Sequence, residues 1–191
     1  MPTFSAQELK AFASKYFMHW GVSEADAASA ADVLVSADMR GVDSHGLIRL
    51  QSYYGSRLDQ GLINPRAALT LLRESSTTLT FDANNGLGHP AAVKAMRRCI
   101  EKARESGVAL ATVRNSNHYG IAGYYAMMAL EEGMIGVSFT NSAPLVAPTH
   151  GKAAMLGTNP IAVAVPAKNN RPYVLDMATS IVPIGRVSVY Q

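Results

Sequence analysis

The order of apolar and polar residues predicts two helices at the start of the chain. Ser5 stands before a helix-forming stretch and is followed three residues later by Glu8, which is the capping-box pattern of a helix N-terminus. The same pattern begins at Ser23, ahead of an Ala-rich amphipathic stretch that runs to about Arg40. Two helices are therefore expected before residue 41.

A third helix is expected directly after them. Asp43 or Ser44 can cap its first turn, because both side chains accept hydrogen bonds from free backbone N–H groups. Gly61 follows the last periodic residue, and a glycine in that place commonly ends a helix.

Beyond residue 65, short apolar runs alternate with helix-forming segments. The expected strands are residues 69–72, 77–81, 108–113, 134–140, 161–165 and 173–175, of which 108–113 reads as a buried strand. Helices are expected at residues 90–106 and 121–132, each closed by a glycine. Residues 141–160 contain three prolines and little periodicity, so a long loop of functional character is expected there.

These elements predict an α+β protein with a boundary near residues 62–67. Residues 1–65 would form an N-terminal helical unit, and residues 66–191 a mixed unit of strands and helices. The last segment, from Ile181, ends without a cap or a polar tail, as if it continued into further structure.

Composition narrows the class of protein. The 191 residues include a single cysteine, Cys99, which rules out an internal disulfide framework and fits a cytoplasmic protein. The net charge of +3 comes from scattered residues rather than a basic run, so no nucleic-acid partner is expected. No apolar stretch approaches the ~20 residues of a membrane span, and no secretory signal precedes the first helix.

One group of residues could bind a small acid. His45, Arg49 and Tyr53 are spaced by four, so they would share one face of a helix. Arginine can clamp a carboxylate, and histidine can exchange a proton near neutral pH. A solvated polar face with a capping histidine would have the same spacing, and the spacing alone does not separate the two.

Two further groups lie in loops. Residues 114–120, with Asn115 and His118, fall between a strand and a helix, a junction that ligands favour, although a polar turn would look the same. Residues 157–160 and 176–180 read by themselves as a turn and a strand end.

A fourth pattern is a weak match to the dinucleotide fingerprint. Gly86, Gly88 and Ala91 have the spacing of a G-x-G-x-x-A motif, but Pro90 is awkward within it, so a plain helix start is the preferred interpretation. The five histidines show no metal-ligand spacing, and no hydrolase triad or G-x-S-x-G motif is present.

Taken together, these segments resemble one family. It is the malate/L-lactate dehydrogenase family with a non-Rossmann NAD(P) fold, which includes ureidoglycolate dehydrogenases, diketogulonate reductases and piperideine-2-carboxylate reductases. The motifs that carry the resemblance are Asp43-Ser44-His45-Gly46 with Arg49 and Tyr53, Asn115–Gly120 leading to Ala122–Tyr125, Gly157-Thr158-Asn159-Pro160, and Leu175–Ser180.

The resemblance implies hydride transfer between NAD or NADP and a small 2-hydroxy or 2-keto acid, or a related imino acid. His45 would exchange the proton, Ser44 would orient the reacting group, and His118 would belong to the same catalytic set. Arg49 and Tyr53 would hold the substrate carboxylate. Thr158 is implied as a further substrate contact, and the cofactor contacts implied are His118, Tyr119, Gly120, Ser142, Asn159, Asp176, Met177 and Ala178.

The resemblance also implies a largely antiparallel sheet and a homodimer. It makes residues 1–65 the unit with the substrate-binding and catalytic helix, and residues 66–191 the cofactor-binding unit. Members of the family are considerably longer, so the C-terminal part of the cofactor-binding unit is expected to be missing. Two alternatives remain: a catalytically silent truncated dimerisation module, and a conventional Rossmann enzyme that uses Gly86 and Gly88.

Overall fold

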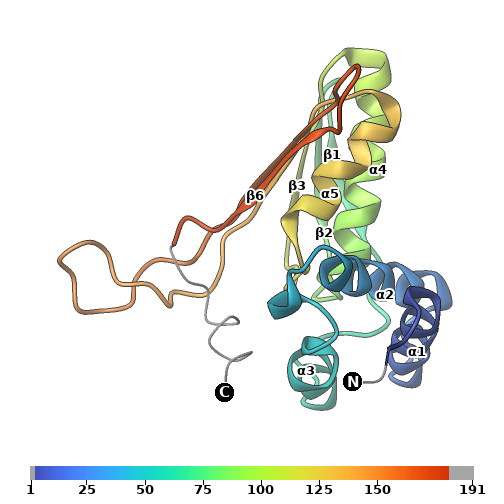
Figure 1. Ribbon diagram of the computed structural model, residues 1–191, viewed down its shortest axis with the longest axis vertical. Helices are drawn as coiled ribbons and strands as arrows, with labels where there is room; N and C mark the ends of the chain where they lie inside the picture. The colour runs from blue at the N-terminus through green and yellow to red at the C-terminus, as the bar shows by residue number, and fades with distance from the viewer. Residues whose placement is uncertain (1–2, 181–191) are drawn as a thin grey trace. The chain divides into compact units, whose positions relative to one another are not determined.

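The computed structural model describes residues 3–180, and the chain divides after Ile121 into two compact units. The helices and strands of the first unit are α1 (Ala6–His19), α2 (Glu24–Met39), α3 (Ser56–Asp59), β1 (Thr70–Glu74), β2 (Thr78–Asp82), α4 (Gly88–Ser106) and β3 (Leu110–Arg114) (Figure 1). The boundary predicted near residues 62–67 falls inside this unit, between its helices and its sheet.

The two N-terminal helices begin as their sequences predict. The Ser5 hydroxyl accepts a hydrogen bond from the Glu8 backbone N–H at 3.2 Å, and the Glu8 carboxylate accepts one from the Ser5 N–H at 2.9 Å. The Ser23 hydroxyl accepts from the Asp26 N–H at 3.3 Å and caps α2. Local capping therefore fixes both starts.

The prediction of one continuous third helix, from residue 43 to about residue 61, is wrong. A 3₁₀ turn spans Asp43–His45, a π-helical turn spans Leu50–Gly55, and only α3 is α-helical. The break lies at Gly46, where the backbone has φ −91° and ψ −149°. The Asp38 carboxylate on α2 accepts the backbone N–H of the residue after Gly46, Leu47, at 2.9 Å, so a tertiary contact holds the chain out of the helix.

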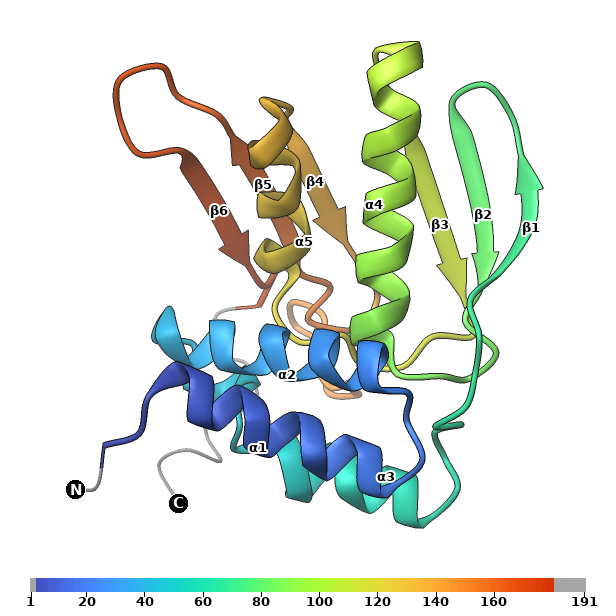
Figure 2. The same cartoon turned by 90° about the vertical axis from the view of Figure 1, so that its right-hand side faces the viewer.

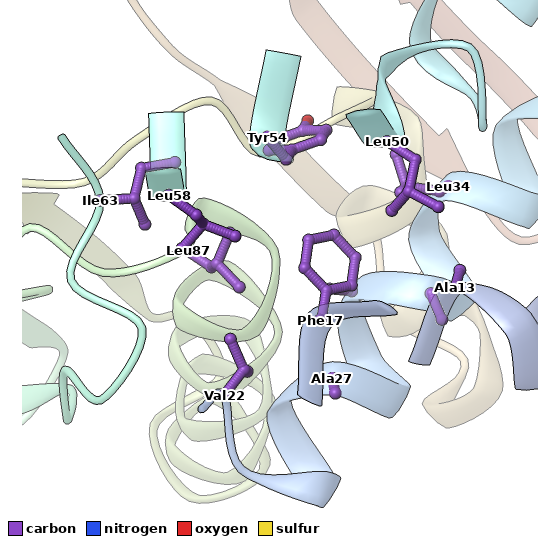
Figure 3. Close-up of a cluster of buried hydrophobic side chains, with 12 residues drawn as sticks. Ala13, Phe17, Val22, Ala27, Leu34, Leu50, Tyr54, Leu58, Ile63 and Leu87 are labelled. Atoms are coloured by element: carbon purple, nitrogen blue, oxygen red, sulfur yellow. The ribbon is translucent and has the colours of Figure 1, made fainter. Parts of the chain in front are cut away.

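The helices enclose an apolar core built around aromatic rings. The Phe17 ring of α1 stands at 67° to the Tyr54 ring, with 6.0 Å between centroids, and both side chains are fully buried. Figure 3 shows Leu34 and Leu50 beside them, while Ile63 and Leu87 close the other side. Burial of each large apolar side chain contributes about 1.5–3 kcal/mol, so this core holds the helices together.

The first sheet has the order β1-β2-β3. β1 and β2 are antiparallel, whereas β2 and β3 are parallel and joined by α4, which packs on the sheet (Figure 2). Gly107 ends α4 in the left-handed region, at φ +80°, as a closing glycine should. The prediction of a buried strand at residues 108–113 is wrong, because β3 lies at the sheet edge and Leu110 is half exposed.

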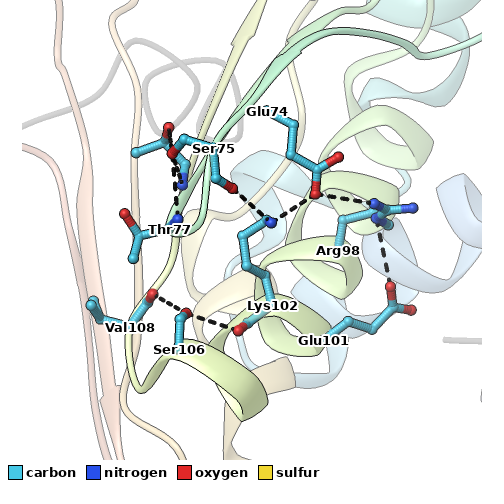
Figure 4. A network of polar contacts seen from close by, with 9 residues as sticks. Glu74, Ser75, Thr77, Arg98, Glu101, Lys102, Ser106 and Val108 are labelled. Atoms are coloured by element: carbon cyan, nitrogen blue, oxygen red, sulfur yellow. Dashed lines mark hydrogen bonds and ion pairs between the residues drawn. The ribbon is translucent and has the colours of Figure 1, made fainter.

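Polar contacts tie the β1–β2 hairpin to α4. Lys102 donates hydrogen bonds to the Glu74 carboxylate at 2.7 Å and to the Ser75 carbonyl at 2.9 Å, and Arg98 lies 3.7 Å from Glu74 (Figure 4). Exposed ion pairs contribute about 0–1 kcal/mol each, so this network orients the hairpin more than it stabilises it.

The second unit contains α5 (Ala122–Met128), a 3₁₀ turn (Ala129–Glu132) and three antiparallel strands in the order β4-β5-β6. The strands are β4 (Gly136–Phe139), β5 (Ile161–Val165) and β6 (Tyr173–Met177). Three of the four strand pairings among the described residues are antiparallel, which confirms the α+β class and the largely antiparallel sheet.

The sheet of the second unit has two different faces. Ala162 and Ala164 are buried on the face toward α5. Phe139, Ile161 and Met177 pair across the three strands on the other face and remain 65%, 44% and 51% exposed. The described chain therefore presents an apolar row on this sheet.

The loop predicted at residues 141–160 contains a single isolated bridge, between Val146 and Leu156. Over residues 3–180, no helix is long and apolar enough to cross a membrane. The segment 181–191, whose sequence suggested further structure, lies outside the described residues.

Candidate active site

The loop after β3 is anchored by a buried carboxylate. Asp82, at the end of β2, accepts hydrogen bonds from the Arg114 Nε at 2.8 Å and from the Asn115 side chain at 2.9 Å. The backbone N–H of Asn84 also points at this carboxylate, and with the Arg114 and Asn115 bonds it lowers the pKa of Asp82. This network fixes the loop that leads to His118.

The same loop passes directly over the first turn of α4. The Asn117 side chain donates to the backbone carbonyls of Asn85, at 3.1 Å, and Gly86, at 2.9 Å. A methyl group at Gly88 would overlap the Asn117 carbonyl and lie 2.6 Å from that of His118. Gly88 is therefore explained by backbone packing, and the phosphate-binding role of the Rossmann alternative has no room there.

His45 is held in its turn by neighbouring residues. The Ser44 hydroxyl lies 2.9 Å from the His45 Nδ1, and the Arg49 Nε donates to the Ser44 carbonyl at 2.5 Å. A side chain at Gly46 would overlap the Asp38 carboxylate, so α2 also sets the path of this turn. No local pattern marks Asp38, which lies five residues before the motif that begins at Asp43.

The first unit brings four of the predicted site residues together. The rings of His45 and His118 stack with centroids 5.5 Å apart and planes at 22°. The Tyr53 ring lies 5.2 Å from that of His118, and the Arg49 guanidinium lies 5.6 Å from the Tyr53 centroid. This cluster forms without the shared helix face that the spacing of four suggested, because the break at Gly46 lies within it.

A second arginine completes the surroundings of Tyr53. The Arg57 guanidinium lies over the Tyr53 ring at 4.7 Å from its centroid, so two cations lie close to this ring. Neither Arg49 nor Arg57 has a carboxylate partner among the described residues. Two guanidinium groups without an anion beside two imidazoles make a local environment suited to an anionic ligand.

The imidazoles of the cluster are neutral at neutral pH. Burial, together with the charge of Arg49, lowers the pKa of His45 to about 4. Burial, together with the electrostatic effect of the neighbouring His45 and Arg49, lowers the pKa of His118 well below its ordinary value. In this state His45 can accept a proton, as a general base requires.

Two buried aromatic residues behind the cluster were not singled out by the sequence. The Tyr54 hydroxyl lies 2.5 Å from the His118 Nδ1. The His89 ring packs 4.6 Å from the Tyr54 ring, and both side chains are fully buried. No local pattern in the sequence marks Tyr54 or His89 as part of the site. The Tyr54–His118 and Tyr54–His89 contacts both join segments that lie far apart in the sequence.

Three predicted residues gather in the second unit. The Ser142 hydroxyl lies 3.0 Å from the Thr158 hydroxyl and accepts the Thr158 backbone N–H at 2.8 Å. The Asn159 side-chain carbonyl accepts the Ser142 backbone N–H at 3.0 Å. Gly157 permits this close approach, because a methyl group there would lie 2.5 Å from the Ser142 carbonyl.

The remaining predicted residues lie elsewhere. The Asp176 carboxylate on β6 accepts the Gly123 backbone N–H at 2.7 Å, so in the structure it supports the start of α5. Met177 ends β6 and Ala178 follows it. Tyr119 and Gly120 continue the His118 loop, and no cluster of three metal-ligating side chains occurs among residues 3–180.

The family is shown by comparison with known proteins. The family model described as malate/L-lactate dehydrogenase matches residues 4–191. The chain belongs to this family. A malate dehydrogenase of Pyrococcus abyssi is 51% identical over 184 residues, which cover 96% of this chain and 50% of the relative. An L-sulfolactate dehydrogenase of Methanocaldococcus jannaschii is 44% identical over 88% of the chain and 48% of the relative.

Solved structures of the malate/L-lactate dehydrogenase family share this fold. The structure of malate dehydrogenase from Pyrococcus horikoshii superposes with a TM-score of 0.93 at 46% identity, covering 98% of this chain and 53% of that one. The chain thus spans about half the length of the relatives it matches, and the resemblance stated from the motifs is confirmed.

Proposed function

We propose that this chain carries the substrate-binding and proton-transfer groups of an NAD(P)-dependent dehydrogenase that interconverts a 2-hydroxy acid and its 2-keto acid. The observation that supports it most directly is the stacked pair of His45 and His118, 5.5 Å apart, next to the Arg49 guanidinium. Oxidation of a hydroxy acid needs a base for the hydroxyl proton and a cation for the carboxylate, and this cluster contains both.

Each residue has a defined part in the proposed reaction. In oxidation, the neutral His45 takes the hydroxyl proton of the substrate as the C–O single bond becomes a carbonyl and the hydride leaves carbon 2. Ser44, 2.9 Å from the His45 Nδ1, orients the imidazole and the reacting oxygen. Arg49 binds the carboxylate, with Tyr53 beside it. In reduction, a protonated His45 returns the proton to the carbonyl oxygen.

The two arginines favour a substrate with a second acidic group. Arg49 and Arg57 flank Tyr53 at 5.6 and 4.7 Å from its ring, so a molecule with two anionic ends could contact both. The relatives named as malate dehydrogenase and L-sulfolactate dehydrogenase act on acids of this kind, which supports the same preference here. Lactate or a cyclic imino acid would use only one of the two.

The cofactor of the proposal is NAD or NADP, which accepts or supplies the hydride when bound. The Ser142, Thr158 and Asn159 cluster offers neutral hydroxyl and amide groups, and such groups suit the ribose hydroxyls and carboxamide of a dinucleotide. His118 and Gly120 would add contacts near the reacting carbon. Residues 119 and 176–178 complete the proposed contacts. We also propose that the protein is cytoplasmic and forms a homodimer. Light scattering of the purified chain would test the dimer.

The test is oxidation of NADH and of NADPH by the purified chain with oxaloacetate, pyruvate and a cyclic imino acid. Replacement of His45 by Ala should lower kcat by about 10²–10⁴-fold, since general acid–base catalysis contributes that much. The exposed His19, also replaced by Ala, serves as the matched control and should leave kcat unchanged. Arg57→Gln should raise the KM for oxaloacetate more than the KM for pyruvate.

Two outcomes would contradict the proposal. Turnover that survives the loss of His45 would exclude its role as the proton carrier. A folded dimer that neither binds nicotinamide nor turns over any of these acids would favour a catalytically silent dimerisation module.

A further inference from the structure

The two donors that converge on one nitrogen of His118 determine how this residue can act. The Tyr54 Oη lies 2.5 Å from the His118 Nδ1, and the backbone N of Gly120 lies 3.2 Å from the same atom. A backbone N–H can only donate, so the Nδ1 must present its lone pair. The phenol must then donate as well, because two acceptors would face each other if it did not.

The protonation states of both groups agree with this arrangement. Complete burial raises the pKa of Tyr54 well above its ordinary value, so the phenol keeps its hydrogen. Burial lowers the pKa of His118 and keeps its ring neutral, and the neighbouring ionisable groups His45, Arg49, His89 and Arg57 act in the same direction. A neutral imidazole carries one proton, and with the Nδ1 occupied as an acceptor that proton is on the Nε2.

We infer that Tyr54 and the Gly120 N–H fix His118 as its Nε2–H tautomer, which makes Tyr54 a positioning residue of the proposed 2-hydroxy acid site. The inference rests on the proposed function only for its catalytic meaning. His118 then offers a hydrogen-bond donor to the substrate or cofactor, while the adjacent His45 exchanges the proton. The two stacked histidines thus have separate tasks.

The packing around Tyr54 keeps its hydroxyl in place. Its ring contacts the rings of Phe17, Tyr53 and His89, with centroids 6.0, 5.1 and 4.6 Å away. No part of the side chain is exposed. A ring enclosed on several sides loses little further freedom when its hydroxyl forms a hydrogen bond, so the donor is preorganised.

The backbone conformation and the packing of Gly120 also keep its N–H in place. Its φ of +80° lies in the left-handed region, which favours glycine. A methyl group at this position would lie 2.8 Å from the Val33 Cγ1 and 3.3 Å from the His89 Cδ2. Only glycine therefore allows the backbone N–H to approach the His118 Nδ1 in this conformation.

The tautomer can be measured without any turnover. Long-range ¹H–¹⁵N NMR of the ¹⁵N-labelled chain at pH 7.5 distinguishes a ring nitrogen that carries hydrogen from one that carries a lone pair. The His118 signals are identified by their loss in His118→Gln. The expected spectrum has a lone-pair shift at the Nδ1 and an N–H shift at the Nε2. The opposite assignment, or equal averaged shifts, in the wild-type chain would overturn the inference.

A substitution of Tyr54 tests whether its hydroxyl sets the tautomer of His118. Tyr54→Phe should move both His118 nitrogen shifts toward averaged values, because only the longer Gly120 bond remains. Tyr16→Phe, which removes a phenol from the same helical core, should leave them unchanged. Unchanged shifts in Tyr54→Phe would refute the role of Tyr54, and a variant that fails to fold leaves the wild-type spectrum as the deciding result.

An activity measurement separates this inference from the proposed function. In a chain that turns over, Tyr54→Phe should lower kcat by about threefold to tenfold, the worth of one hydrogen bond, with little change in KM. An inactive chain with the expected tautomer would contradict the proposed function and leave the assignment of His118 standing. An active chain in which His118 carries its proton on the Nδ1 would contradict the assignment of His118 and leave the proposed function standing.

Discussion

The buried His89 makes the stability of the protein depend on pH in a defined way. Its side chain has no exposed surface, and neither ring nitrogen has a hydrogen-bond partner among the described residues. Burial lowers the pKa of His89 to about 3. Protonation therefore favours the unfolded chain, in which an imidazole has a pKa of about 6.5.

The size of the effect follows from the two pKa values. Stability is fully present above the unfolded-state pKa and is lost as the pH falls toward the folded-state value, because the unfolded chain then binds more protons. At pH 5 the unfolded imidazole is almost fully protonated, whereas the folded one is not. With 1.36 kcal/mol per pKa unit, His89 should lower the free energy of unfolding by about 2 kcal/mol between pH 8 and pH 5.

Urea unfolding of the wild-type chain and of His89→Leu, each at pH 8 and pH 5, isolates this contribution. The substitution changes packing equally at both pH values, so the difference between the two pH differences belongs to the titration of His89. The loss between pH 8 and pH 5 should be about 2 kcal/mol smaller in the variant. An identical loss in both proteins would refute the assignment of His89 as a neutral core residue.

Three further substitutions test the fold. Ser5→Ala removes the N-cap of α1 and should lower the free energy of unfolding by about 1 kcal/mol in urea, and no loss would contradict the cap. Gly88→Ala should destabilise the chain by about 1–3 kcal/mol, since the new methyl overlaps the Asn117 carbonyl, and an unchanged midpoint would contradict that contact. Phe139→Thr should reduce self-association in light scattering, because this 65% exposed ring belongs to an apolar row, and equal scattering would exclude that row as the cause.

Local signals account for the parts of the fold that the sequence predicts well. The hydroxyls of Ser5 and Ser23 cap α1 and α2 within their own first turns, and Gly107 ends α4 in the left-handed conformation. Each signal acts over three or four residues, so it can be found without knowledge of the tertiary structure.

The two predictions that were wrong, the third helix and the buried strand, failed because of tertiary structure. The helix expected from residue 43 is broken because Asp38, on α2, binds the backbone after Gly46. The strand at residues 108–113 looks buried by composition, yet it lies at a sheet edge and Leu110 remains half exposed. Apolar residues alone do not distinguish an edge strand from a central one.

Sequence motifs were enough to predict the residues of the candidate site. They did not reveal the residues that hold those side chains in place, such as Tyr54. The spacing of His45, Arg49 and Tyr53 marked the side chains that gather at His118. Tyr54 contacts His118 across 64 residues of sequence, and no periodicity encodes such a pair. The catalytic and binding roles of these residues remain predictions.

Isothermal titration calorimetry of L-malate with the purified chain tests whether the His45 and His118 cluster is a 2-hydroxy acid site. We expect saturable binding that is abolished in Arg49→Gln and preserved in Arg73→Gln, a matched change on the exposed β1. Malate that binds the wild-type chain and Arg49→Gln equally, or that does not bind the wild-type chain at all, would contradict a 2-hydroxy acid site at His45 and His118.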